Sequence, residues 1–182
     1  MSRRIIVLIL VLMVVFAGSL SAQERSEKDT ASDFDIGVVL NYSYADLRDQ
    51  NFESYIPTVR FQMNVLSWLG FSATGYARGQ DYVAFVLEAV LRVPLGWIEP
   101  YFATGPGYMM AFNNESSESG TSNIAYNIRT GFDIRITDWF SLGPGITLLI
   151  PDVSDFFNNL SNLDIQYLKE TCLIGFGGKL RF

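Results

Sequence analysis

The chain has 182 residues, a formal net charge of −6 and no histidine, and apolar residues make up 49% of its composition. The acidic balance argues against a nucleic-acid-binding protein, and the lack of histidine excludes Ser-His nucleophiles and imidazole metal ligands. We therefore expect no enzymatic activity, no catalytic residue, no metal and no other cofactor.

The first 22 residues have the three-part pattern of a secretory signal peptide. Two arginines precede an apolar run over 5–17, and small residues follow up to Ala22. The run is shorter than the roughly 20 apolar residues that a membrane-spanning helix needs, which argues against a membrane anchor. We predict a signal peptide over 1–22 with cleavage after Ala22; cleavage after Ser19 is the alternative.

Residues 23–33 are polar and charged, which is typical of a disordered lead-in, here on the periplasmic side. From residue 34 onward, apolar residues alternate with polar or small ones. Alternation with period two predicts β-strands that have two different faces. We predict eight strands, in chain order over 34–46, 55–66, 70–79, 82–94, 98–112, 122–136, 139–150 and 171–182.

The strand predicted over 122–136 shows the two faces most clearly. Phe132 and Ile134 fall on one face, whereas Arg129 and Asp133 fall on the other. The same division recurs in most of the other segments. It predicts one continuous apolar surface and one polar surface for the whole sheet.

Short and long connections alternate between the predicted strands. The connections after residues 46, 112 and 150 are long, whereas those near Trp68, Trp97 and Trp139 are short. An outer-membrane barrel has short turns on the periplasmic side and longer loops outside the cell. Indole rings favour the membrane interface, so we interpret the three tryptophans as interface aromatics. The predicted fold class is all-β: an eight-stranded antiparallel up-and-down transmembrane β-barrel over 34–182.

A water-soluble barrel with an apolar lumen is the alternative architecture. Its lumen would have to hold Phe61, Phe85, Phe176 and many further apolar side chains, and eight strands enclose too little space for them. We therefore predict that the apolar face contacts lipid and that the polar face lines the lumen.

Charges inside a narrow barrel are costly unless they are paired, so we predict a lumen charge network that closes the lower half. This network either fills the lumen or acts as a gate with a mild anion preference. Inward-facing glycines leave the upper half either packed by long side chains or open to a thin water path. The network comprises Asp35, Arg60, Glu88, Arg92, Glu99, Arg129, Asp133, Arg135, Lys179 and Arg181.

Two stretches and the last residue carry a family resemblance. Residues 98–108 (IEPYFATGPGY) are similar to a "PY-x-G-x-G-x-G-Y" fifth strand, with Ala103 at the first glycine position, and 130–142 (TGFDIRITDWFSL) are similar to a sixth-to-seventh hairpin. Both patterns belong to the eight-stranded outer-membrane barrels of diderm bacteria, the group with OmpA-type transmembrane domains, OmpX, OmpW and the opacity proteins. The resemblance implies that Phe182 is the assembly signal, read by the outer-membrane barrel assembly machinery.

Two functions remain open at this stage. The first is a charge-plugged barrel in the bacterial outer membrane, with a structural or surface-interaction role (adhesion or host contact) through its extracellular loops. Phe156 and Phe157, in the loop over 151–170, either contact an extracellular partner or cap the barrel mouth. The alternative is a narrow porin-like channel for ions or small hydrophobic molecules. Outer-membrane lipid is the expected environment in both cases.

Overall fold

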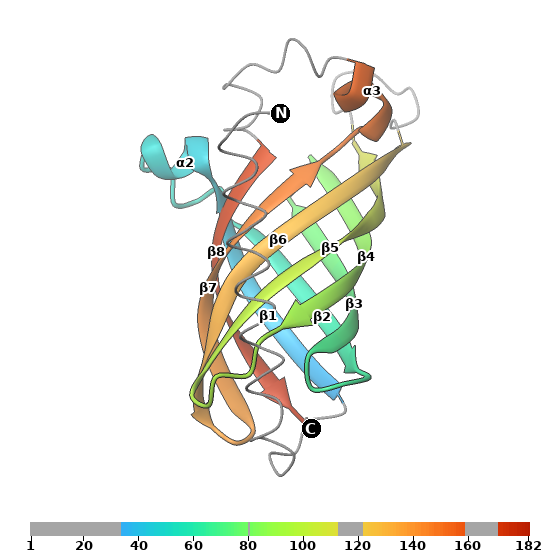
Figure 1. Cartoon of the computed structure of the whole chain (residues 1–182). Helices are drawn as coiled ribbons and strands as arrows, with labels where there is room; N and C mark the ends of the chain where they lie inside the picture. The colour runs from blue at the N-terminus through green and yellow to red at the C-terminus, as the bar shows by residue number, and fades with distance from the viewer. Residues whose placement is uncertain (1–33, 80, 113–121, 159–170) are drawn as a thin grey trace, which may run out of the picture.

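The computed structural model describes residues 34–79, 81–112, 122–158 and 171–182, so the predicted signal peptide and lead-in lie outside it. Eight antiparallel strands form a closed barrel in which each strand pairs with its chain neighbours and β1 pairs with β8 (Figure 1). The predicted fold class is thus confirmed. The strands are β1 (Phe34–Ser43), β2 (Ile56–Asn64), β3 (Leu69–Arg78), β4 (Tyr82–Arg92), β5 (Ile98–Ala111), β6 (Ser122–Thr137), β7 (Phe140–Ile150) and β8 (Cys172–Arg181).

Two short helices, α2 (Tyr44–Arg48) and α3 (Val153–Asn158), lie in the connections. The prediction of a first strand that reaches residue 46 is wrong at its end, because the chain turns helical at Tyr44. The physical reason is a helix cap: the Ser43 hydroxyl accepts a hydrogen bond from the Asp46 amide at 3.0 Å. A serine followed three residues later by an acidic residue is a helix start signal that the strand pattern obscured.

Side-chain burial alternates along the strands, so the barrel has an apolar outside and a filled inside. On β4, for example, Leu87 is 69% exposed on the outer surface, whereas its neighbours Val86 and Glu88 are buried inside. Every strand contributes apolar side chains to the outer surface. Among the most exposed are Val38, Phe61, Met63, Phe71, Phe85, Leu87, Ile124, Ile136, Ile146 and Phe176.

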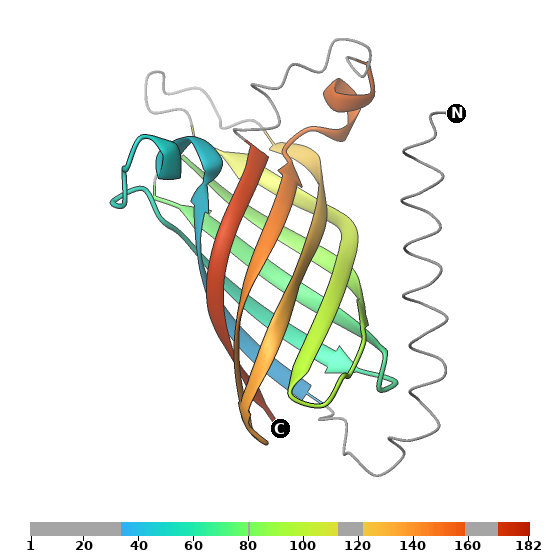
Figure 2. The same ribbon diagram turned by 60° about the vertical axis from the view of Figure 1, so that its left-hand side comes forward.

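The two ends of the barrel differ. The short hairpins β2–β3, β4–β5 and β6–β7 lie at the end where β1 begins and β8 finishes, which we call the short-turn end. Trp97 and Trp139 are exposed there, and Trp68 is partly buried. Helices α2 and α3 lie at the opposite end, which we call the loop end (Figure 2). The connections over 113–121 and 159–170 lie outside the described residues.

Candidate functional site in the barrel interior

The inward-facing side chains of the described residues form three layers along the barrel axis. An apolar layer lies at the loop end, a central layer surrounds Glu88, and a charged layer lies at the short-turn end. The apolar layer consists of Ile56, Tyr76, Ala84, Val86, Met109, Ala125, Leu149 and Leu173.

The apolar layer lies in the upper half of the lumen. Sequence reasoning left either packed long side chains or a thin water path there. Packed side chains are present: Ile56 is fully buried, and Tyr76 and Val86 are almost fully buried. A small cavity lies beside Tyr76. The signal was present in the sequence, because these residues share the inward parity of their strands. Sequence reasoning did not predict a separate apolar layer, because charged residues dominated the interpretation of that face.

In the central layer, the Glu88 carboxylate is the acceptor for several donors, and Glu88 is only 3% exposed. The hydroxyls of Ser72 and Thr74 donate to Oε2 at 2.7 and 2.6 Å. The amide of Asn127 donates to Oε1 at 2.6 Å. Arg129 donates from Nε to Oε1 at 3.1 Å and from Nη2 to Oε2 at 3.0 Å, which makes a bidentate buried ion pair.

In the layer at the short-turn end, Lys179 holds three carboxylates together. Its ammonium nitrogen lies 2.7 Å from Asp133 Oδ2, 3.1 Å from Glu99 Oε1 and 3.8 Å from Asp35 Oδ2. All four residues are buried. Lys179 therefore neutralises like charges that would repel each other in a site sheltered from water.

Two arginines complete this layer. Arg181 donates from Nη1 to Glu99 Oε2 at 3.1 Å and from Nε to the Ser141 hydroxyl at 2.9 Å. Arg92 Nη1 lies 3.7 Å from carboxylate oxygens of both Asp35 and Glu99. The layer joins side chains from strands that are distant in the sequence at the short-turn end.

The structure thus connects eight of the ten residues of the predicted charge network, and it separates them into two groups. Glu88, which we expected in the lower half, pairs with Arg129 in the central layer instead. Arg60 and Arg135 form no ion pair with any described residue. Arg60 instead packs with its guanidinium carbon 5.8 Å from the centre of the Tyr101 ring, while Arg129 lies 4.9 Å from the same centre.

A further polar cluster at the loop end joins the first connection to the β3–β4 turn. Arg78 donates from Nη2 to Asp46 Oδ2 at 3.1 Å and to the Ser54 hydroxyl at 3.3 Å, and its Nε lies 3.5 Å from Asp81. Sequence reasoning missed this cluster because its members come from separate connections. We regard it as a tie that holds α2 against the barrel rim.

Phe182 lies at the short-turn end, where its backbone amide donates to the Phe34 carbonyl at 2.8 Å and its side chain is exposed. Within the described ranges, no group of three or more His, Cys, Asp or Glu side chains is arranged to hold a metal ion. None of the helices in that part of the chain has the length and apolar character to cross a membrane.

The closed sheet defines the fold: an eight-stranded antiparallel up-and-down β-barrel, the architecture that outer-membrane barrels have. Comparison of the sequence with models of protein families and with curated proteins found no match. Among solved structures, the chain is similar to the N-terminal β-barrel domain of Pseudomonas aeruginosa OprF. The TM-score is 0.62 at 12% identity, over 84% of this chain and 100% of that domain.

Two other solved structures support the same assignment. Neisserial surface protein A (NspA) matches with a TM-score of 0.51 at 13% identity, over 82% of this chain and 94% of that one. A de novo designed transmembrane β-barrel matches with a TM-score of 0.53 at 11% identity, over 85% of this chain and 99% of the design. The resemblance drawn from the sequence is therefore confirmed at the level of the fold, and at these identities the likeness extends no further.

Proposed function

We propose that this protein is an integral outer-membrane barrel with a plugged lumen, which acts structurally and through surface contacts of its loops. The observation that carries the proposal is the filled interior, in which an apolar layer and two charged layers follow one another along the axis. A barrel closed in this way presents its ends, rather than a pore, to the two sides of a membrane.

The outer surface supports a position in lipid. A water-soluble monomer rarely exposes a continuous apolar patch of more than a few hundred Å², yet large apolar side chains such as Phe61, Leu87 and Ile124 are exposed on strands around the barrel. Closure of the sheet pairs the backbone groups of neighbouring strands, which a hydrocarbon environment requires. These features are expected of a barrel that crosses the outer membrane.

The interior supports a plug more than a channel. A permeant ion would have to leave water and pass the apolar layer, where Ile56, Tyr76 and Val86 are buried. Removing a charge from water without partners is costly, and apolar constrictions block conduction by dewetting. The ion pairs of Glu88 and Lys179 then close the path below that layer.

Surface contact through the loops is the proposed role for a barrel that does not conduct. The loop end carries α2 and α3 and the longer connections. Loops of outer-membrane barrels on this side face the outside of the cell, and one structural neighbour is by its name a surface protein. The loop over 151–170 is the proposed contact site for an extracellular partner.

Planar-bilayer recording tests the plug. We expect refolded protein to give no discrete current steps under conditions in which a general porin, added to the same bilayer afterwards, opens readily. Discrete and reproducible openings from the purified chain would instead establish the channel alternative. An epitope inserted in the connection over 113–121 tests the orientation: antibody should reach it on intact cells, and staining only after permeabilisation would contradict extracellular loops.

A further inference from the structure

The central layer carries a positive charge that its own residues do not balance. Glu88 is its one inward carboxylate among the described residues, whereas Arg60 and Arg129 both reach into it. The bidentate ion pair between Glu88 and Arg129 accounts for one of the two cations. One excess positive charge therefore remains between the apolar layer and the layer at the short-turn end.

Arg60 has no ion-pair partner among the described residues. It is 8% exposed, and its Nε is a buried donor that lacks a hydrogen-bond acceptor. A buried lysine could lose its proton, but an arginine stays protonated in proteins. The ring face of Tyr101 supplies only a weak compensating contact. A second donor that lacks an acceptor, Nη1 of Arg129, is buried in the same layer.

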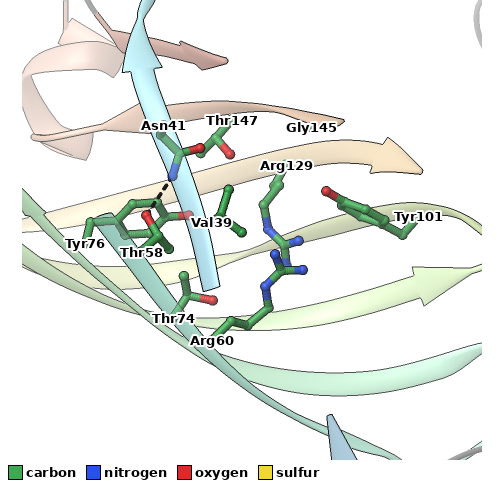
Figure 3. A pocket seen from close by; sticks show the side chains of 10 residues that line it. All are labelled: Val39, Asn41, Thr58, Arg60, Thr74, Tyr76, Tyr101, Arg129, Gly145 and Thr147. Carbon is green, nitrogen blue, oxygen red and sulfur yellow. Dashed lines mark hydrogen bonds between the residues drawn. The ribbon is translucent and has the colours of Figure 1, made fainter. Parts of the chain in front are cut away.

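A small cavity is lined by both Arg60 and Arg129. Figure 3 shows Arg60 from β2 and Arg129 from β6 pointing toward each other, with Tyr101 beside them. The other polar groups of the lining are an asparagine amide and the hydroxyls of Tyr76 and threonines, and no carboxylate lines the cavity. The free space is small, with room for about one water molecule.

We propose that this cavity binds one small monovalent anion, with chloride as the natural candidate, between the guanidinium groups of Arg60 and Arg129. The anion neutralises the excess charge, accepts hydrogen bonds from the guanidinium groups that line the cavity, and reduces the repulsion between these two groups. The size of the cavity selects a monatomic ion over larger organic anions. The site is a structural counterion site and does not depend on whether the barrel conducts.

Thermal unfolding in detergent provides the test. The wild-type protein is compared in sodium chloride, sodium bromide and sodium gluconate at equal ionic strength. We expect the apparent Tm to rise with chloride concentration and to saturate, as linkage to a bound ligand requires, while gluconate leaves it unchanged. Arg60→Gln should abolish the chloride dependence. Arg135→Gln removes an arginine that also has no ion pair with a described residue, and it should retain the dependence.

Equal Tm values in chloride and gluconate would overturn the proposal and leave a water molecule as the occupant. A chloride dependence that persists in Arg60→Gln would also overturn it, because the anion would then bind elsewhere. Crystals of the wild-type protein grown in bromide give a measurement that does not rely on the variant folding. An anomalous peak between Arg60 and Arg129 would confirm the site, and a clear map without such a peak would contradict it.

Discussion

Glu88→Gln tests the central layer most sharply, because it keeps the shape of the side chain while it removes the charge and one acceptor oxygen. All five polar contacts of the carboxylate come from donors: Ser72, Thr74, Asn127 and two nitrogens of Arg129. A carboxylate can accept all of them with its two oxygens. The amide of glutamine has a single acceptor oxygen, so the donors that faced the other oxygen lose their acceptor.

The expected loss of stability has two contributions: the lost ion pair with Arg129, and the repulsion that then acts between Arg129 and Arg60. Removing one partner of a buried ion pair costs about 3–5 kcal/mol, because the remaining charge stays buried. Arg129 would keep its full charge beside Arg60, which also has no ion pair with a described residue. These two contributions overlap, and the side chains relax. We therefore expect the free energy of unfolding to fall by about 3–5 kcal/mol in total.

Urea unfolding of protein folded into lipid vesicles, followed by tryptophan fluorescence, measures this change. Glu53→Gln removes the same charge from an exposed residue and is the matched control; we expect a change of less than about 0.5 kcal/mol there. If Glu88→Gln and Glu53→Gln had the same stability within about 1 kcal/mol, the ion pair would not be a closed, buried contact. The reasoning for the central layer would then be refuted.

Two further predictions concern the same fold. Lys179→Met leaves three carboxylates without their shared cation, so it should lower the unfolding free energy by about 3 kcal/mol or more in the same assay. Arg135→Met removes no ion pair with a described residue and should lower it by less than about 1 kcal/mol. Equal losses for the two variants would contradict the charged layer at the short-turn end. Gly143→Ala places a Cβ 2.8 Å from the carbonyl carbon of Phe132, so it should lower the melting temperature of the refolded barrel. The Cβ of Gly37→Ala meets nothing closer than 3.6 Å and should leave the melting temperature unchanged. A lower melting temperature for Gly37→Ala than for Gly143→Ala would contradict the observed packing.

The sequence was sufficient for the strands, because the barrel's two environments impose a period of two on every strand. All eight predicted segments correspond to strands, and their ends differ by three residues at most. The largest difference, at the end of β1, arises from a local cap by Ser43 that competes with strand extension. Strand pairing needed no further information, because each strand pairs with its chain neighbours and only β1 and β8 close the barrel.

The contacts inside the barrel could not be predicted in the same way. Parity shows that Glu88 and Arg129 point inward, but their contact spans 41 residues and depends on how the tilted strands stagger around the barrel. The contact between Lys179 and Glu99 spans 80 residues for the same reason. Pairing therefore follows from the three-dimensional stagger, and sequence reasoning could supply only the set of candidates.

The central claim is that the apolar face of each strand contacts lipid while the other face is packed inside the barrel. Nitroxide labels on Leu87→Cys and Val86→Cys, neighbours on β4, test it directly in a Cys172→Ser background reconstituted in bilayers. We predict that the label at Leu87 collides with oxygen dissolved in the lipid and not with a water-soluble nickel complex, while the label at Val86 is protected from both. A label at Leu87 that is readily accessible to the nickel complex would contradict the account.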